Sequence, residues 1–225
     1  MKHTIILTAG GIGKRMGEKI PKQFLKINDT PILIHNLKNV YKFNNNFEII
    51  ITLPEEWVSY WKDLLKKNSI DINHKIVNGG EERYHSIKNA INQSSGDTIS
   101  VHDGVRPLVS HDTLSRIYDA ANNHSAIAPY IPINESIREK KGLKNRSKNR
   151  DEVVIIQTPQ CFKREVLIEA YKKPFEKTFT DDATLVESNG TSIFLVEGNQ
   201  ENIKITSPKD IAISEAIMNI AETKK

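Results

Sequence analysis

Three glycines in four positions give the first loop of this chain its chemical character. Without side chains, Gly10, Gly11 and Gly13 allow the backbone to approach a ligand closely. Their N–H groups can then point inward and form a cradle for anions. Arg15 adds a planar bidentate donor and Lys22 adds a point charge. These residue types at this spacing predict a loop that binds a polyphosphate.

The loop matches neither of the two common glycine-rich phosphate motifs. The P-loop pattern lacks its first glycine, where Thr8 stands, and its Ser/Thr, where Arg15 stands. The dinucleotide fingerprint starts at Gly11, but its third glycine comes one residue late, at Gly17. A plain strand-to-helix turn therefore stays open as the alternative to a phosphate-binding loop.

Two later loops repeat the combination of glycine and arginine. They are Gly79–Arg83 and His102–Pro107, and each follows a short apolar run that is typical of a buried strand, as the first loop also does. Ligands in parallel sheets bind beyond the carboxyl ends of the strands. We therefore expect the three loops to meet at one edge of a sheet and to form a single site.

The whole chain alternates between strand and helix patterns. Strands are predicted at residues 4–8, 47–53, 75–77, 98–101, 126–132, 153–157, 192–196 and 202–205. Helices are predicted at 31–42, 55–67, 83–91, 112–122 and 163–172, with further helices that begin at N-cap residues Thr180 and Ser207. This alternation predicts an α/β fold with a Rossmann-like, doubly wound, mostly parallel sheet, in one domain over residues 1–225.

Composition excludes several classes of function. The 38% hydrophobic and 27% charged residues fit a globular protein, and a net charge of +4 does not require nucleic acid. A single cysteine and seven histidines without metal-ligand spacing argue against disulfides and against a Cys or His metal site. With no apolar run long enough to span a bilayer and a start directly in a strand, we expect a cytoplasmic protein without membrane contact.

One segment interrupts the alternating pattern. Residues 133–155 are a polar excursion between two predicted strands, and residues 135–152 are almost wholly polar and charged. The simplest interpretation is a solvated surface hairpin. The alternative is a β-arm that reaches a second subunit, which would make the protein a homodimer.

An ordered set of motifs resembles the 2-C-methyl-D-erythritol 4-phosphate cytidylyltransferase family of non-mevalonate isoprenoid biosynthesis. The matching stretches are residues 9–16, 21–24, 79–83, 102–107, 157–160, 180–183, 197–199 and 202–206. The resemblance implies a Rossmann-like domain whose β-arm interlocks two subunits. It also implies transfer of CMP from CTP to a sugar-alcohol phosphate, with Mg²⁺ and with release of pyrophosphate.

The resemblance implies a group of residues that bind the nucleotide. This group consists of Ala9, Gly10, Gly11, Gly13, Arg15, Lys22, Gly80, Glu81, Ser86 and Gly104. Arg15 and Lys22 would hold the triphosphate. Gly80, Glu81 and Ser86 would line the pocket for cytosine and ribose.

A second implied group faces the sugar-alcohol phosphate. It consists of Asp103, Arg106, Ser136, Arg150, Thr158, Lys204 and Thr206, with Thr180 and Thr206 in supporting positions. Asp103 would face both Mg²⁺ and the substrate, and Lys204 would contact the α-phosphate. Arg150 and Thr158 would come from the partner's arm. The catalytic residues would be Arg15, Lys22, Lys204 and Arg150.

The chemistry implied by the family suits a site without a catalytic triad. The attacking phosphate monoester has a second pKa of about 6, so it is already an anion and needs no strong base. The reaction needs charge neutralisation and in-line alignment. The first loop also looks like ribitol-5-phosphate cytidylyltransferases, so that substrate stays an alternative, as does a non-catalytic nucleotide-binding module on the same fold. The runs 180–183 and 197–199 favour methylerythritol phosphate.

Overall fold

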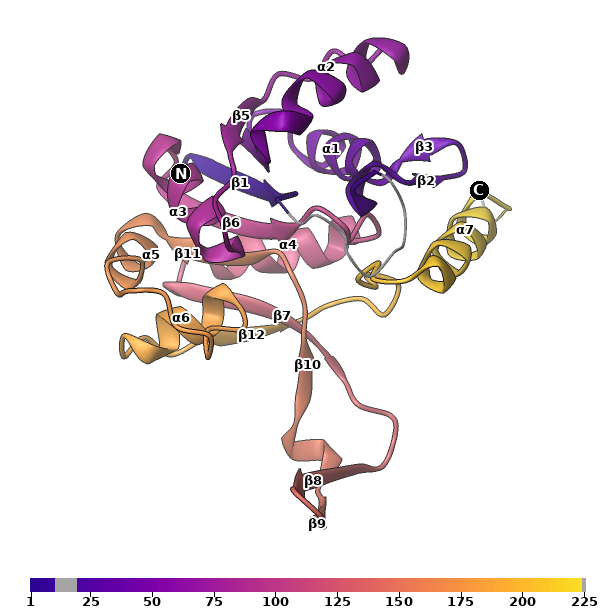
Figure 1. Ribbon diagram of the computed structural model, residues 1–225. Helices are drawn as coiled ribbons and strands as arrows, with labels where there is room; N and C mark the ends of the chain where they lie inside the picture. Colours follow the sequence, from indigo (N-terminus) through magenta and orange to yellow (C-terminus); the bar gives the residue numbers. More distant parts are fainter. Residues whose placement is uncertain (11–19, 224–225) are drawn as a thin grey trace.

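The computed structural model describes residues 1–10 and 20–223, and its centre is one twisted sheet (Figure 1). Within these residues the sheet has eight strands in the order β10-β7-β11-β6-β1-β4-β5, with β12 paired to β7. The parallel half consists of β1 (His3–Thr8), β4 (Glu48–Leu53), β5 (Lys75–Asn78) and β6 (Thr98–Asp103). The predicted α/β fold with a mostly parallel sheet is confirmed.

The apolar run of β1 is fully buried because it has a strand on each side and a core on each face. Ile6 pairs in register with Ile50 of β4 and with Val101 of β6. Ile5 and Leu7 point into one core, whereas Ile6 points into the other. This alternation across a central strand is what a doubly wound sheet requires.

Helices cover both faces of the sheet and connect its parallel strands. One core receives residues from α1 (Ile32–Phe43), α2 (Val58–Lys67) and α4 (His111–Ala120). The other receives residues from α3 (Arg83–Gln93), α5 (Arg164–Ala170) and α6 (Asp182–Ser188). The last helix, α7 (Pro208–Thr223), begins at Pro208 as predicted and lies beside the small hairpin of β2 (Lys26–Ile27) and β3 (Thr30–Pro31). No helix in the described part of the chain is long and apolar enough to cross a bilayer.

The far half of the sheet differs most from the prediction. The helix expected from residue 163 is preceded by a strand, β11 (Gln160–Lys163), which pairs antiparallel with β6 and β7. Residues 202–205 form no strand, although Ile205 N donates to Val105 O at 2.9 Å. The N-cap of α6 is Asp181 and not Thr180, because the Asp181 carboxylate accepts from the backbone of Thr184.

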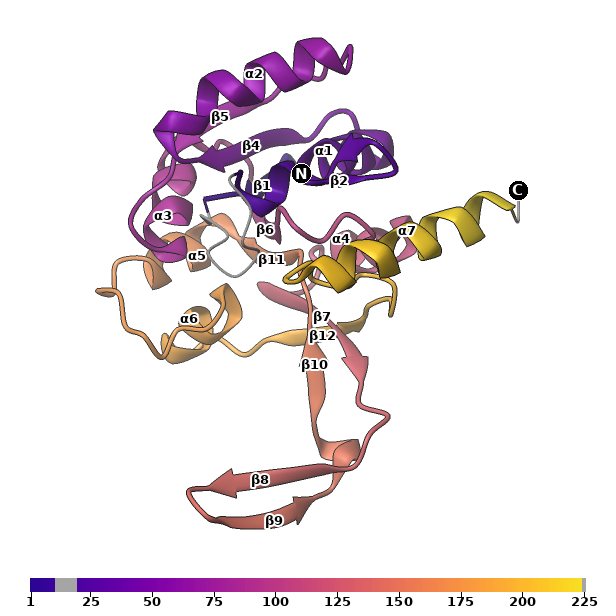
Figure 2. The ribbon, with the colours of Figure 1, turned by 45° about the vertical axis from the view of Figure 1, so that its right-hand side comes forward.

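The polar excursion is a hairpin that extends away from the sheet (Figure 2). The strands β7 (Ala126–Pro132) and β10 (Val154–Ile156) lead out from the body and back. The hairpin itself, which we call the arm, consists of β8 (Ile137–Lys141) and β9 (Lys144–Lys148), followed by the short helix η4 (Arg150–Glu152). On the other edge of β7, β12 (Phe194–Glu197) pairs in parallel and leads towards Lys204.

Candidate active site

The carboxyl ends of β1, β5 and β6 meet around one cavity, as the sequence predicts. The cavity measures about 450 Å³ and is lined by Thr8, Ala9, Gly10, Lys22, Gln23, Pro54, Gly80, Glu81, Glu82, Arg83, Ser86, Asp103, Val105 and Lys204. Described residues of all three glycine-bearing loops therefore contribute to one site. Lys204 comes from a fourth segment, after β12.

Close backbone contacts explain two of the glycines in this cavity. A Cβ atom on Gly104 would lie 2.8 Å from the carbonyl oxygen of Thr8, and the Gly104 N–H donates to that oxygen at 2.9 Å. A Cβ atom on Gly10 would lie 3.0 Å from the hydroxyl of Ser86. That hydroxyl also accepts from the Gly80 N–H at 3.0 Å. The absence of side chains therefore lets the three loops approach one another closely.

The last residue of β6 is a carboxylate surrounded by three cations. Asp103 is 6% exposed, and its oxygens lie 3.0 Å from Lys204 Nζ, 3.3 Å from Arg106 Nε and 3.6 Å from Arg83 Nε. Burial alone would raise the pKa of Asp103, but the charges of Arg83, Lys204 and Arg106 hold it well below its usual range. Lys204, Arg106 and Arg83 therefore lie together at this end of the cavity, where their side chains can meet the oxygens of a polyphosphate.

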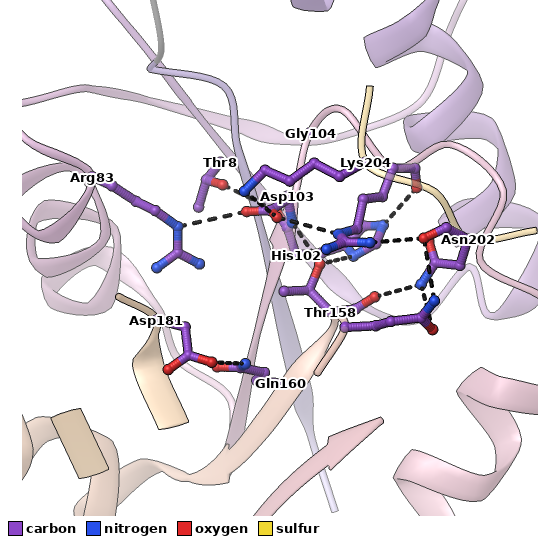
Figure 3. Close-up of polar contacts among 12 residues, drawn as sticks. Thr8, Arg83, His102, Asp103, Gly104, Thr158, Gln160, Asp181, Asn202 and Lys204 are labelled. Carbon is purple, nitrogen blue, oxygen red and sulfur yellow. Dashed lines mark hydrogen bonds and ion pairs between the residues drawn. The ribbon is translucent and has the colours of Figure 1, made fainter. Parts of the chain in front are cut away.

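Behind Asp103, a buried network joins three segments of the chain (Figure 3). His102 is fully buried, with Nδ1 2.9 Å from Thr158 Oγ1 and Nε2 3.0 Å from the carbonyl oxygen of Arg106. Burial lowers the pKa of His102 to about 4, so its imidazole is uncharged at neutral pH. Arg106 Nη1 donates to Asn202 O at 2.8 Å, and Asn202 Nδ2 donates to Thr158 O at 2.9 Å.

Arg83 connects the site to helix α6. Its Nη2 lies 2.7 Å from the carboxylate of Asp182, whose side chain is fully buried and also accepts from the Tyr171 hydroxyl at 2.6 Å. A second cavity of about 330 Å³ lies on this side, and Arg83 lines both cavities. Gln160 supports the same corner, because its amide bonds to the carboxylate of Asp181 and to the N–H of Ala183. The start of α6 is thereby fixed against the charge cluster.

Comparison with known proteins identifies the family. A sequence model of the 2-C-methyl-D-erythritol 4-phosphate cytidylyltransferase family matches residues 3–220. The chain belongs to this family. A relative of that name from Bacteroides thetaiotaomicron is 41% identical over 220 residues, which cover 97% of this chain and 100% of that protein. Another, from Bacillus cereus, is 34% identical over 222 residues and covers 97% and 98%.

Solved structures agree with the sequence comparison. The 4-diphosphocytidyl-2C-methyl-D-erythritol synthase of Anaerococcus prevotii matches with a TM-score of 0.83, 25% identity, and coverage of 97% of this chain and 98% of that one. The 2-C-methyl-D-erythritol 4-phosphate cytidylyltransferase of Thermus thermophilus matches with a TM-score of 0.80, 27% identity, and coverage of 97% and 100%. As a member of the family, the chain is a nucleotidyltransferase.

The structure brings together most of the residues that the resemblance singled out. In the cytidylyltransferase cavity lie Ala9, Gly10, Lys22, Gly80, Glu81, Ser86, Asp103 and Lys204. Arg106 and Gly104 adjoin it through Asp103 and Thr8. Gly11, Gly13 and Arg15 lie outside the described residues.

Four of the predicted substrate residues lie elsewhere in this chain. Ser136 and Arg150 are exposed on the arm segment, where Arg150 Nη1 donates to Asn134 O at 2.6 Å. Thr206 lies at the start of α7 and bonds to the carboxylate of Asp210. Thr158 was expected to reach a partner's site from the arm. The structure corrects this, because Thr158 is 5% exposed and its hydroxyl bonds to His102 and Asp103 of its own chain.

Sequence reasoning assigned no role to three residues that build this site. Arg83 and His102 stood inside recognised motifs, but only their three-dimensional partners show what they do. Asn202 was placed in a predicted strand, whereas its side chain is fully buried and joins Thr158 to the segment that carries Lys204. The sequence around Asn202 alternates between polar and apolar residues, so it gave no signal of this role.

The donor set around Asp103 fits a metal ion that arrives with a polyphosphate. The described residues contain no group of three His, Cys, Asp or Glu side chains that could hold a metal by themselves. Mg²⁺ commonly binds through one or two carboxylates together with substrate phosphates. Asp103 supplies one carboxylate at the cavity, and Glu81 and Glu82 also line it. A preformed protein cage is therefore not needed.

Proposed function

We propose that this chain transfers CMP from CTP to 2-C-methyl-D-erythritol 4-phosphate and releases pyrophosphate. The observation that carries the proposal is the cavity at the carboxyl edge of the sheet, where Lys204, Arg106 and Arg83 surround Asp103 and Lys22 contributes to the lining. Family membership then specifies which polyanions meet there.

The charges of the cavity match the demands of the reaction. Two anions, the α-phosphate and the attacking phosphate monoester, must approach each other in line. Preorganised cations offset this repulsion and the charge that develops on the pentavalent phosphorus. We assign the α-phosphate to Lys204, the triphosphate to Lys22 and Arg15, and the second substrate to Arg106 and Asp103. Mg²⁺, held by Asp103 and the triphosphate, would supply further charge neutralisation.

The glycine loops supply the nucleotide pocket in this proposal. The Ser86 hydroxyl lies close to the backbone of both Gly10 and Gly80, and Glu81 lines the same cavity. Without side chains at Gly10 and Gly80, a flat base could lie close to the backbone at this wall of the cavity. We therefore place cytosine and ribose at this end of the cavity and the phosphates towards Lys204.

We also propose a homodimer in which the arm completes the site of the partner. In one chain Arg150 and Ser136 are exposed and do not line the cavity. The arm between them extends away from the sheet (Figure 2). A guanidinium binds phosphate through two parallel hydrogen bonds, and a closed twofold dimer would offer one Arg150 to each site.

An assay with two substrates tests the proposed activity. Purified protein with CTP and Mg²⁺ should release pyrophosphate only after methylerythritol phosphate is added, and the CDP-alcohol should form in equal amount. Ribitol 5-phosphate run in parallel should turn over more slowly. Faster turnover of ribitol phosphate would assign the enzyme to that substrate, and retention of unchanged CTP with both alcohols would make the protein a binding module.

A further inference from the structure

The interior beneath the charge cluster contains a chain of three hydrogen bonds, and chemistry fixes the donor and the acceptor in two of them. The Arg106 carbonyl can only accept, so the 3.0 Å contact requires a proton on Nε2 of His102. The Asp103 N–H can only donate, so at 3.0 Å the Thr158 hydroxyl accepts from it. The single Thr158 proton is then free to go to Nδ1 of His102, 2.9 Å away. In this arrangement each ring nitrogen of His102 makes one hydrogen bond, and the Thr158 hydroxyl accepts one and donates one.

This chain closes around the turn that carries two of the charged groups. Its ends are the N–H of Asp103 and the carbonyl of Arg106, and the same turn is closed by Arg106 N donating to Asp103 O at 3.0 Å. His102 therefore clamps both ends of the turn from within the protein. Through Thr158, the chain also reaches Asn202 and so the segment of Lys204.

The geometry points to His102 as a positioning residue, held with a proton on Nε2, that together with Thr158 fixes Asp103 and Arg106 for phosphoryl transfer. His102 cannot serve as a general acid or base, because it is fully buried, both ring nitrogens are occupied and it does not line the cavity. Only the expected effect on kcat rests on the proposed function. The tautomer is a property of the folded chain without substrate.

Two substitutions at Thr158 separate positioning from packing. Thr158→Ser keeps the hydroxyl and both of its hydrogen bonds, whereas Thr158→Val keeps the shape and removes both. A displacement of about 1 Å in a catalytic group can reduce the rate about 10²-fold. We therefore expect kcat to fall on the order of 10²-fold in Thr158→Val, with CTP affinity changed less than about threefold, and to stay within about threefold of wild type in Thr158→Ser.

His74 offers a matched control, because it also bonds through both ring nitrogens but lies outside the cavity. It accepts from Trp61 Nε1 at 3.1 Å and lies 2.7 Å from Ile72 O. His74→Gln should lower the unfolding midpoint and leave kcat unchanged. If Thr158→Val lost stability as His74→Gln does and kept its kcat, the positioning role would be refuted.

The tautomer itself is measured by long-range ¹H–¹⁵N correlation NMR on the wild-type protein, with the His102 signal assigned by its loss in His102→Gln. The expected result is a proton on Nε2, unchanged in Thr158→Ser. An Nε2 without a proton would overturn the inference. This measurement needs no turnover, so failure of the proposed activity with either alcohol phosphate would leave the tautomer result standing on its own.

Discussion

Two regions of this chain are rich in charge but use it in opposite ways. Around Asp103, three cations converge on one carboxylate whose side chain is only 9% exposed. On the arm, residues 140–150 are all exposed, and in the pair of Arg146 and Glu139 the arginine side chain is 73% exposed. The two regions contain the same types of charged residue and differ in how far these side chains are exposed to solvent.

Burial determines how strongly a charged side chain interacts with its neighbours. Exposed pairs are screened by water and salt and contribute about 0–1 kcal/mol. A pair in a region of low dielectric interacts much more strongly and must be held in place by further hydrogen bonds. We therefore expect the charges around Asp103 to interact more strongly than those of the arm, whose charged side chains would be desolvated only if another surface covered them.

Removal of a cavity charge should give the largest effect. We expect Lys22→Ala to reduce kcat by a factor on the order of 10² or more, because a preorganised cation acts on charge that develops in the transition state. Lys26→Ala is the matched control and should leave kcat unchanged. It also removes a lysine, but one that is 58% exposed and forms a 3.8 Å ion pair with a fully exposed Asp29. Near-normal kcat with a raised KM in Lys22→Ala would show that Lys22 contributes uniform binding instead.

A matched pair of arginine substitutions tests burial directly. Arg83→Gln leaves the buried Asp182 carboxylate without its cation, so we expect a loss of about 2 kcal/mol in unfolding free energy. This is below the roughly 3–5 kcal/mol for a fully buried pair, because the Arg83 side chain is 33% exposed. Arg146→Gln on the arm should change it by less than about 0.5 kcal/mol. Urea unfolding measures both, and equal losses would contradict the comparison.

Mixed dimers test whether the arm works across an interface. Lys22→Ala and Arg150→Ala chains, each inactive alone, are unfolded and refolded together. If Arg150 serves the partner, each mixed dimer has one site with both defects and one with neither, so about one site in four regains activity. If Arg150 serves its own chain, every site keeps one defect. An inactive mixture, with subunit exchange confirmed by mass, would remove the arm from the mechanism.

Local patterns were sufficient to predict the parallel half of the sheet. The run that became β1 is apolar at every central position, and helical spacing located α1 and α2 to within a few residues. The antiparallel strand β11 was missed because its neighbours β6 and β7 are far away in sequence, so no local period reports the pairing. Residues 202–205 read as a strand because their pattern alternates, although tertiary hydrogen bonds hold them as coil.

The same limit applies to the site. Glycine and charge at strand ends identified the cavity, because the carboxyl ends of parallel strands must share an edge. The position of Thr158 could not be predicted, since motif order alone cannot show whether a residue after the arm returns to its own chain. The pairing of Arg83 with Asp182, 99 residues apart, was equally beyond the reach of sequence patterns.

A pair whose burial lies between those of the two regions should show its effect on the pH dependence of stability only at acidic pH. Glu48 is 11% exposed while its partner Lys75 is 52% exposed. Burial alone would raise the pKa of Glu48, but hydrogen bonds from Lys75, Thr4 and Ser95 lower it to about 2, below the ordinary 4.5 that applies when unfolded. Its contribution to stability is therefore complete above about pH 4.5 and is lost as the pH falls through 2. Glu48→Gln should flatten the dependence of the urea midpoint on pH between 5 and 3. Glu139→Gln on the arm should leave this dependence as in wild type. Identical slopes in wild type and both variants would show that partial burial does not make the Glu48–Lys75 pair contribute to stability.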